Sequence, residues 1–238
     1  MIKIERVDVF GWEAAIRGMR NPLESWEKSD SRWCYENQRN KSSCSQMVCD
    51  DCIKPFYEIG ENDLKLMKSL VEAGSDHRKF LRMINVTCDI VAPLYWWKEY
   101  DTYKVGTVAN SCSTMHKIHA KEFTLDDFSH EHLTDKWSDE NELIAYNGEY
   151  NNAPQDVLEF IIDALNLYRI RYIQTKDKKY WYDMIQILPT SYNQRRTVQL
   201  NYEVLRNMYH ARKSHVLDEW VEFCEWIETL PYSELITG

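Results

Sequence analysis

The last third of the sequence concentrates residues that could bind an anion. Asn201 and Arg212 would project from nearly the same side of a continuous helix, because eleven helical steps return to within about 20° of the starting direction. Guanidinium groups bind phosphate through paired hydrogen bonds, and an asparagine amide can read a base or ribose edge. The pattern therefore indicates a nucleotide site, with a solvent-exposed basic helix face as the alternative. The basic residues are Arg195, Arg196, Arg206, Arg212 and Lys213.

A second candidate stretch, residues 92–116, changes character halfway along its length. It begins with the aromatic run Tyr95 to Trp97 and continues from Val108 to Thr114 with small and hydroxylated residues. We expect the aromatic half to form a helix that either lines a ligand pocket or packs in the core. We expect the polar half to form a loop whose N–H groups and hydroxyls face a phosphate, with a simple surface turn as the alternative.

Four of the seven cysteines are close together in the sequence and could bind zinc. Two of them form a CxxC pair, whereas the other two are further apart than in most structural zinc sites. The surrounding residues 30–56 are largely polar, which predicts a cysteine-rich surface insertion. Structural zinc, a loop of unligated thiols and a transient disulfide are all compatible with this pattern. The candidate ligands are Cys34, Cys44, Cys49 and Cys52.

The remaining chemistry-bearing residues are isolated. His77, in the segment GSDHRKF, could contact a ligand or have a structural role. His116 and His119 have a spacing that suits a metal, but no third ligand is apparent nearby, so we do not expect a metal there. The sequence contains no glycine-rich phosphate loop and no GxSxG or HExxH motif. With seven glycines in 238 residues, a Rossmann or P-loop nucleotide site is not expected.

The composition is that of a globular protein and limits the possible partners. The chain is 44% hydrophobic and 28% charged, and 238 residues can bury a substantial core. The formal net charge of -9 argues against direct nucleic-acid binding, although a local group of arginines can still bind a small anion. No apolar run approaches the ~20 residues that span a bilayer, and the charged N-terminal residues are unlike a signal peptide. We therefore expect a soluble, cytoplasmic protein.

Hydrophobic periodicity predicts the elements that must position these residues. The pattern indicates one α/β domain with long helices, with an acidic loop over residues 123–152. Asn62 would be the N-cap of the second helix. Strands are expected over residues 2–10 and 83–91, and helices over residues 12–19, 62–73, 94–103, 154–170, 179–188 and 216–230.

The C-terminal motif resembles that of the flavin-dependent thymidylate synthases. Leu188-Pro189 is followed by Asn201, Asn207 and Arg212, in the order of the family's LP…N…N…R pattern ahead of a helix. The segment SDHRKF is similar to the family's EH-x-x-F segment and puts His77 in the place of its flavin-contacting histidine. Together these matches identify the chain as a divergent, phage-type relative.

The resemblance also covers the N-terminal part of the chain. Residues 12–20 occupy the place of the family's Ala-Arg element, and residues 92–116 fall on its signature segment. The order of elements agrees over most of the chain, except in residues 30–56 and 123–152.

The signature segment departs from the family pattern at charged positions. Asn110 and Ser113 match, whereas Lys98-Glu99-Tyr100 stands where the family has Arg-His-Arg. Met115 and Glu203 replace two arginines that contact the nucleotide in the family. Each lost charge-assisted contact could weaken binding by ~1.5–3 kcal/mol. Basic residues elsewhere could compensate: Lys98, Lys104, Arg195 and Arg196.

The resemblance implies a fold, a reaction and a set of ligands. The fold would be α/β (α+β), a single domain over residues 1–238 with a central, mostly antiparallel sheet flanked by long helices. The family methylates dUMP with methylenetetrahydrofolate as carbon donor, FAD as hydride source and NADPH as reductant, and it works as a homotetramer with shared sites. Arg212 would orient and polarise the pyrimidine, and His77, Asn201 and Asn207 would contact FAD. Substrate contacts would come from Asn110, Ser111, Ser113, Arg195 and Arg212.

A second reading keeps the fold but changes the function. The degenerate signature is also compatible with a protein that modifies another pyrimidine nucleotide. It is equally compatible with one that binds a nucleotide without turnover, as a sponge or regulator would.

Overall fold

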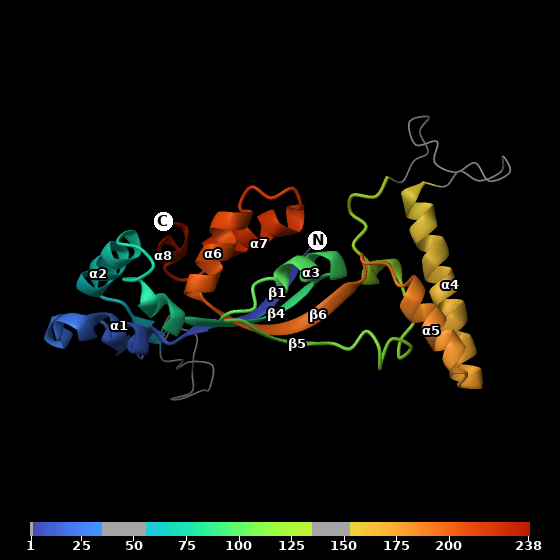
Figure 1. Ribbon diagram of the computed structural model, residues 1–238, viewed down its shortest axis with the longest axis horizontal. Coiled ribbons are helices and arrows are strands. Elements are labelled where there is room, and N and C mark those ends of the chain that lie inside the picture. Colours follow the sequence, from blue (N-terminus) through green and yellow to red (C-terminus); the bar gives the residue numbers. More distant parts are fainter. Residues whose placement is uncertain (1, 35–55, 135–152) are drawn as a thin grey trace, which may run out of the picture.

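The computed structural model describes residues 2–34, 56–134 and 153–238, and the elements of these segments are shown in Figure 1. The strands are β1 (Lys3–Phe10), β2 (Arg32–Cys34), β3 (Phe56–Glu58), β4 (Asn85–Pro93), β5 (Val108–Ser111) and β6 (Asn193–Asn201). The helices are α1 (Trp12–Arg20), α2 (Glu61–Glu72), α3 (Leu94–Tyr100), α4 (Pro154–Thr175), α5 (Lys178–Ile187), α6 (Tyr202–Arg212), α7 (Asp218–Glu228) and α8 (Glu234–Thr237). No helix in these segments is long and apolar enough to cross a membrane.

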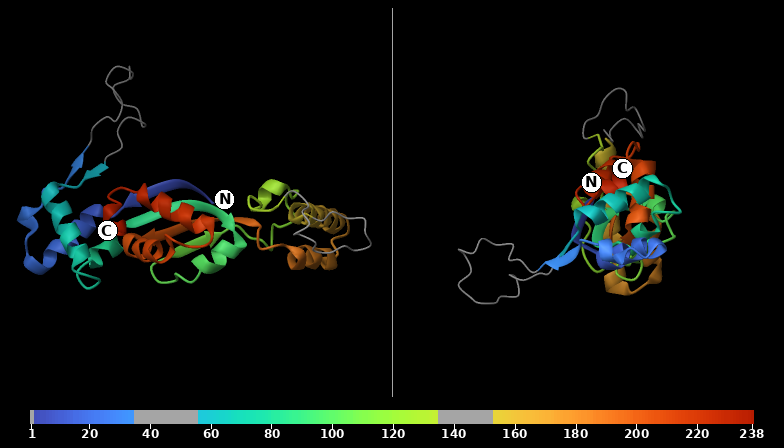
Figure 2. Two further views of the ribbon diagram at one scale, coloured as in Figure 1. Left: turned by 90° about the horizontal axis from the view of Figure 1, so that it is seen from above. Right: turned by 90° about the vertical axis from the view of Figure 1, so that its left-hand side faces the viewer.

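A four-stranded antiparallel sheet with the order β1-β4-β6-β5 forms the centre of the molecule. Helices α3, α6 and α7 lie over one face of this sheet, whereas α1 and α2 lie at one end and α4 and α5 at the other (Figures 1 and 2). In the described segments no helix covers the opposite face. This arrangement confirms the expected class, an α/β fold with a mostly antiparallel sheet.

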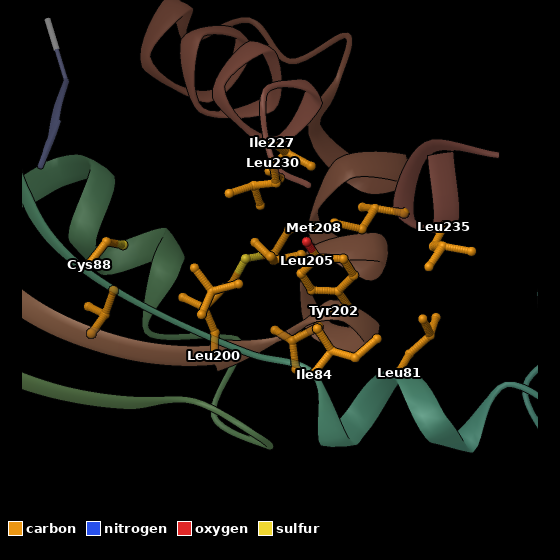
Figure 3. Packing of buried hydrophobic residues seen from close by; sticks show 14 of the residues in the cluster. Leu81, Ile84, Cys88, Leu200, Tyr202, Leu205, Met208, Ile227, Leu230 and Leu235 are labelled. Carbon is orange, nitrogen blue, oxygen red and sulfur yellow. The ribbon is translucent and has the colours of Figure 1, made fainter. Parts of the chain in front are cut away.

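The core lies between the sheet and its helix layer. Side chains of a strand alternate between the two faces, so every second residue of β4 and β6 points toward the helices. Val86, Cys88 and Ile90 of β4 and Val198 and Leu200 of β6 are buried in this way. Figure 3 shows Leu200 beneath the apolar face of α6, where each fully buried aliphatic or aromatic side chain contributes about 1.5–3 kcal/mol. The same core cluster includes, from α6 and the segment that follows it, Tyr202, Leu205, Met208, Ile227, Leu230 and Leu235.

A second, smaller core joins the antiparallel helices α4 and α5 to residues 118–128. Leu158, Ile162 and Leu165 of α4 pack with Met184 of α5. Lys176 adopts a left-handed conformation at the C-cap of α4 and turns the chain toward α5. This helical hairpin lies beyond the end of the sheet in Figure 1.

The predicted helices are confirmed with small shifts in their ends, but four strands were not predicted: β2 and β3 of the small sheet, and β5 and β6 of the central sheet. Residues Val108–Ser111, expected to be part of a loop, form the edge strand β5, because their backbone pairs with β6. Residues Asn193–Asn201, which carried no strand prediction, pair with β4 along their whole length.

The predicted N-cap of α2 was wrong. The helix begins at Glu61 with Gly60 as N-cap, and the backbone N–H groups of Asn62 and Asp63 donate to the carboxylate of Asp30 at 2.9 and 3.1 Å. The cap is therefore supplied by a residue from another part of the chain.

One buried ion pair joins α1, α2 and the segment between α1 and β2. Arg20 Nε donates to Asp63 Oδ1 at 2.7 Å, and the two residues are 4% and 0% exposed. The other carboxylate oxygen of Asp63 accepts hydrogen bonds from the hydroxyls of Ser29 and Ser31 and from the backbone N–H of Ser31. Burial of Asp63 acts to raise its pKa, but these hydrogen bonds and Arg20 outweigh it and hold the pKa below its ordinary value.

We expect Asp63→Asn to lower the free energy of unfolding by about 3–5 kcal/mol at neutral pH, because Arg20 would lose its charge partner in a buried site. A carboxyl group with a lowered folded pKa stabilises the fold above its unfolded pKa of about 3.9, and this contribution is lost as the pH falls through the folded pKa. The difference between wild type and variant should therefore shrink below about pH 4. Urea unfolding followed by circular dichroism at several pH values measures it.

The exposed carboxylate of Asp76 offers a matched control for this experiment. We expect Asp76→Asn to change the free energy of unfolding by no more than about 0.5 kcal/mol. A similarly small effect of Asp63→Asn, or a loss that does not depend on pH, would contradict the assigned role of the ion pair.

Candidate functional site

The loop from residue 101 to 107, between α3 and β5, connects three of the predicted site residues. Asp101, at its start, forms an ion pair of 2.7 Å with Arg196 of β6. Tyr103 accepts a hydrogen bond of 3.0 Å on its hydroxyl oxygen from Arg212 Nε. Gly106 lies so close to Asn201 that an added Cβ would come within 2.9 Å of the amide nitrogen of Asn201. The loop therefore brings Arg196, Asn201 and Arg212 to one side of the sheet.

Arg212 lies in the last turn of α6, between α3 and α7. Its Nη1 donates to Glu99 Oε2 at 2.7 Å, and its guanidinium carbon lies 4.9 Å from the ring centre of Trp220. His215 Nε2 is 3.4 Å from the same Glu99 oxygen. The Arg212 side chain is 20% exposed and that of Glu99 is 34% exposed, so a ligand could reach both.

The aromatic half of the signature segment packs in the core. Trp96 and Trp97 of α3 are fully buried, and Trp96 stacks against Trp220 with ring centres 4.8 Å apart. Trp97 donates its indole N–H to Gln194 O of β6 at 2.9 Å. The two tryptophans therefore pack in the core, which is the second of the two roles expected for them, and Trp96 supports Trp220, whose ring forms the floor beneath Arg212.

The fully buried aromatic groups in and around this floor include polar atoms without partners. The indole N–H groups of Trp96 and Trp220 and the hydroxyl of Tyr100 have no hydrogen-bond partner among the described residues. Burial raises the pKa of Tyr100. Of the three residues Lys98-Glu99-Tyr100 in the Arg-His-Arg position, only Lys98 is exposed and Glu99 is partly so.

The start of α6 is fixed by Asn201 and Glu203. Asn201 is the N-cap, and its side-chain oxygen accepts from the N–H of Val204 at 3.1 Å. Glu203 forms a two-point ion pair with Arg78, with distances of 2.9 Å from Nε to Oε2 and 3.2 Å from Nη2 to Oε1. Arg78 therefore neutralises the carboxylate that was expected to repel a phosphate.

His77 and Asn207 lie apart from Arg212. Asn207 follows Glu203 by one helical turn, and His77 adjoins Arg78, so both are on the Arg78 side of α6. The five positions between Asn207 and Arg212 rotate the helix by about 140°. Both His77 and Asn207 are exposed, and neither side chain has a hydrogen-bond partner in the described segments.

The small polar residues of β5 are exposed at the edge of the sheet. Asn110 and Ser111 pair with Thr197 and Arg196 of β6. Beyond the strand, Ser113 Oγ accepts from the backbone N–H groups of residues 115 and 116 at 3.2 and 2.9 Å. The Ser113 hydroxyl thus closes a turn and retains its own proton to donate.

Arg195 and Arg196 point to opposite faces of the sheet, as neighbours in a strand must. Arg196 stacks on Trp97, with 4.2 Å from its guanidinium carbon to the ring centre, on the face that carries the helices. Arg195 lies on the other face, 3.3 Å from Glu5 and 3.6 Å from Asp89. The resemblance assigned a substrate contact to Arg195 and left Arg196 as a residue that could compensate, but it is Arg196 that shares the face of Arg212.

The metal prediction is tested only in part. Cys34 lies at the end of β2, with its thiol 3.2 Å from Glu58 Oε2. Cys44, Cys49 and Cys52 lie outside the described residues. Within the described ranges, no group of three or more His, Cys, Asp or Glu side chains could hold a metal ion.

A cavity of about 310 Å³ lies near the N-terminal end of α3. Pro189 of the Leu-Pro motif lines this cavity, together with Tyr95 and the two histidines His130 and His132. The Tyr95 hydroxyl donates to the buried carboxylate of Glu219, the residue before Trp220. The cavity is therefore separated from Arg212 by α3 and the first turn of α7.

The chain has the fold of the flavin-dependent thymidylate synthases. Flavin-dependent thymidylate synthase ThyX from Helicobacter pylori, complexed with FAD and dUMP, matches it with a TM-score of 0.60 and 16% identity over 98% of both chains. A second structure of the same enzyme with FAD and dUMP matches with a TM-score of 0.61 and 14% identity, over 100% of this chain and 98% of that one.

The UMP/dUMP methylase PolB from Streptomyces cacaoi, bound with 5-Br dUMP, has a related structure. Its TM-score is 0.55 at 14% identity, over 100% of this chain and 95% of the methylase. No protein-family model and no curated protein matches the sequence.

We expect Glu203→Gln to lower the free energy of unfolding by about 3–5 kcal/mol, because the guanidinium of Arg78 would remain largely buried without its partner. The side chains of Arg78 and Glu203 are 17% and 9% exposed. The double variant Arg78→Met, Glu203→Leu removes both charges and should recover most of this loss. Urea unfolding of Arg78→Met, Glu203→Leu and the double variant measures the coupling between the two side chains.

Glu72→Gln, which changes an exposed carboxylate at the end of α2, is the matched control and should be nearly neutral. If the double variant loses as much stability as the two single changes added together, Glu203 and Arg78 do not act as a pair.

Proposed function

We propose that this chain binds a pyrimidine nucleoside monophosphate and methylates its base at C5, as flavin-dependent thymidylate synthases do. The observation that carries the proposal is the meeting of Arg212, Asn201 and Arg196 around the loop between α3 and β5. The three residues belong to β6 and α6, whereas the loop that touches all of them comes from an earlier part of the chain, 95 positions before Arg196 at Asp101 and 109 before Arg212 at Tyr103. The fold is shared with enzymes whose structures contain FAD and dUMP.

Arg212 is the residue proposed to orient and polarise the pyrimidine. Its guanidinium is held by Glu99, Tyr103 and the ring of Trp220, so its position is set before a ligand arrives. A preorganised cation next to a carbonyl oxygen stabilises negative charge that develops on that oxygen during reaction. The residue needs no nucleophile beside it, since its task is positioning and polarisation.

The nucleotide phosphate is proposed to lie near Arg196 and the edge strand β5. Arg196 shares its face of the sheet with Arg212, and Asn110 and Ser111 lie beside it on β5. The exposed amines of Lys98 and Lys104 have no hydrogen-bond or ion-pair partner in the described part of the chain and add positive charge on either side of the loop. Ser113 can donate its hydroxyl proton to a phosphate oxygen, and Arg195 would contact a nucleotide from the other face.

FAD is the cofactor proposed to supply the hydride, with NADPH and methylenetetrahydrofolate as co-substrates. The exposed imidazole of His77 and amide of Asn207 are free to bond to a flavin, and Asn201 retains its amide protons after capping α6. The resemblance implies a homotetramer with sites shared between subunits, and the separation of His77 and Asn207 from Arg212 supports shared sites. The proposal further includes a single domain over residues 1–238. Residues 30–56 would form a cysteine-rich surface insertion that binds a structural zinc. The protein would be located in the cytoplasm of a phage's host.

The alternative is a protein that binds a nucleotide without methylating it. The ion pair between Glu99 and Arg212 favours this alternative, because a carboxylate beside the guanidinium weakens its pull on a carbonyl oxygen. A sponge or regulator requires only the binding contacts, whereas the methylase also requires flavin.

We expect the purified protein to bind FAD and to keep the absorption bands of oxidised flavin through gel filtration. Replacement of His77 with alanine should weaken FAD binding, because the imidazole would no longer contact the flavin, while the exposed His116→Ala variant serves as control. Release of tritium from C5 of labelled dUMP then tests turnover. A protein that stays colourless in excess FAD but still binds dUMP would overturn the methylase and support the alternative.

We expect Arg196→Met to weaken dUMP binding about 10-fold or more, because a charge-assisted hydrogen bond to phosphate contributes about 1.5–3 kcal/mol. The neighbouring change Arg195→Met is the matched comparison. It should weaken dUMP binding less than Arg196→Met does, since Arg195 faces the other side of the sheet. Isothermal titration with dUMP and with deoxyuridine separates phosphate from base contacts. Equal affinities of wild type and Arg196→Met would remove Arg196 from the phosphate site.

A further inference from the structure

The ion pair between Glu99 and Arg212 leaves one acceptor and one donor unused. Glu99 Oε2 receives Arg212 Nη1 at 2.7 Å and lies 3.4 Å from His215 Nε2. Arg212 Nε is taken by the Tyr103 hydroxyl. Glu99 Oε1 and Arg212 Nη2 have no partner among the residues that the structure describes. Because both side chains are partly exposed, these two atoms are available to a ligand.

The unused acceptor and the unused donor belong to two groups that share a hydrogen bond, which keeps them close to each other. The tie between Oε2 and Nη1 holds the carboxylate and the guanidinium together, and Tyr103 and Trp220 fix the guanidinium. A planar ligand that approaches this pair is therefore selected by the order of donors and acceptors along its edge. Glu99 must receive a donor, because an ionised carboxylate can only accept.

We propose that this pair reads a pyrimidine with an amino group at position 4, so that the preferred nucleotide is a cytidine monophosphate rather than a uridine monophosphate. This inference rests on the proposed function, in which Arg212 contacts the base. Cytosine has the N4 amino donor next to the N3 acceptor, which matches Glu99 followed by Arg212. Acidic side chains are the residues that accept from the N4 amino group of cytosine in other recognition sites.

Uracil does not fit the pair in the same position. Its O4 is an acceptor and would face the Glu99 carboxylate, so two acceptors would oppose each other. Uracil can satisfy the pair only with N3–H on Glu99 and either O2 or O4 on Arg212, which shifts or turns the ring relative to bound cytosine. Either movement displaces C5, and a displacement of about 1 Å can reduce reactivity about 100-fold. The Glu99 carboxylate therefore favours cytosine over uracil in two ways, through the binding affinity and through the position of C5.

The test compares dCMP and dUMP as ligands of the full-length protein by isothermal titration. We expect wild type to bind dCMP about 10-fold or more tightly than dUMP, the range of one paired base contact. Glu99→Gln replaces one carboxylate oxygen with an amide donor of the same shape, so the preference should fall or reverse toward dUMP. Glu225→Gln, an exposed change on α7, is the control and should keep the wild-type preference. Thermal unfolding checks that each variant is folded.

The outcomes separate this inference from the proposed function. If wild type binds dUMP as tightly as dCMP, or more tightly, the base preference is overturned while nucleotide binding stands. If wild type binds neither nucleotide, both are overturned. If wild type prefers dCMP but Glu99→Gln keeps that preference, Glu99 is not the residue that reads the base and the inference fails.

Discussion

The antiparallel pairing of β4 with β6 over their full lengths is the constraint on which the candidate site depends. Each strand runs directly into a helix, β4 into α3 and β6 into α6, and the two helices leave from opposite ends of the pair. Both helices run back over the same face, and their combined length of about 27 Å is close to the ~30 Å of the strands. Their C-terminal ends therefore meet above the sheet, which brings Glu99 of α3 to Arg212 of α6.

The helices α1 to α5 and α7 could be predicted from the sequence because each has an apolar stripe or a clear start, whereas the strands β5 and β6 of the central sheet could not. Every residue of β5 is exposed, so the strand has no alternation for a pattern to show, and only its pairing with β6 defines it. In β6 the adjacent residues Arg195 and Arg196 obscure the period of two. The structure accommodates both because one stacks on Trp97 and the other pairs with Glu5 on the uncovered face.

The motif pattern identified Arg212 but not the partners that determine its chemistry. Glu99 is 113 positions away along the chain, and Glu203 is 125 positions from Arg78. Tertiary packing brings such distant residues together, so no short motif in the sequence indicates that they pair. Both carboxylates replace residues that the resemblance expected to be positive or neutral, and both are paired with arginines of this chain. Glu203 is thereby part of the fold, whereas Glu99, which is more exposed, changes what Arg212 offers to a ligand.

The residues to which the resemblance assigns ligand contacts lie on three different surfaces of the chain. Arg212 lies in the helix layer, His77 and Asn207 lie on the other side of α6, and Arg195 lies on the uncovered face of the sheet. Since α6 and the sheet stand between these surfaces, one nucleotide and one flavin bound to a single copy could not touch all of them. The proposed function therefore requires that sites form between copies. The ion pairs of Glu5 and Asp89 with Arg195 are consistent with that requirement, because they keep the uncovered face charged and polar without a second core layer.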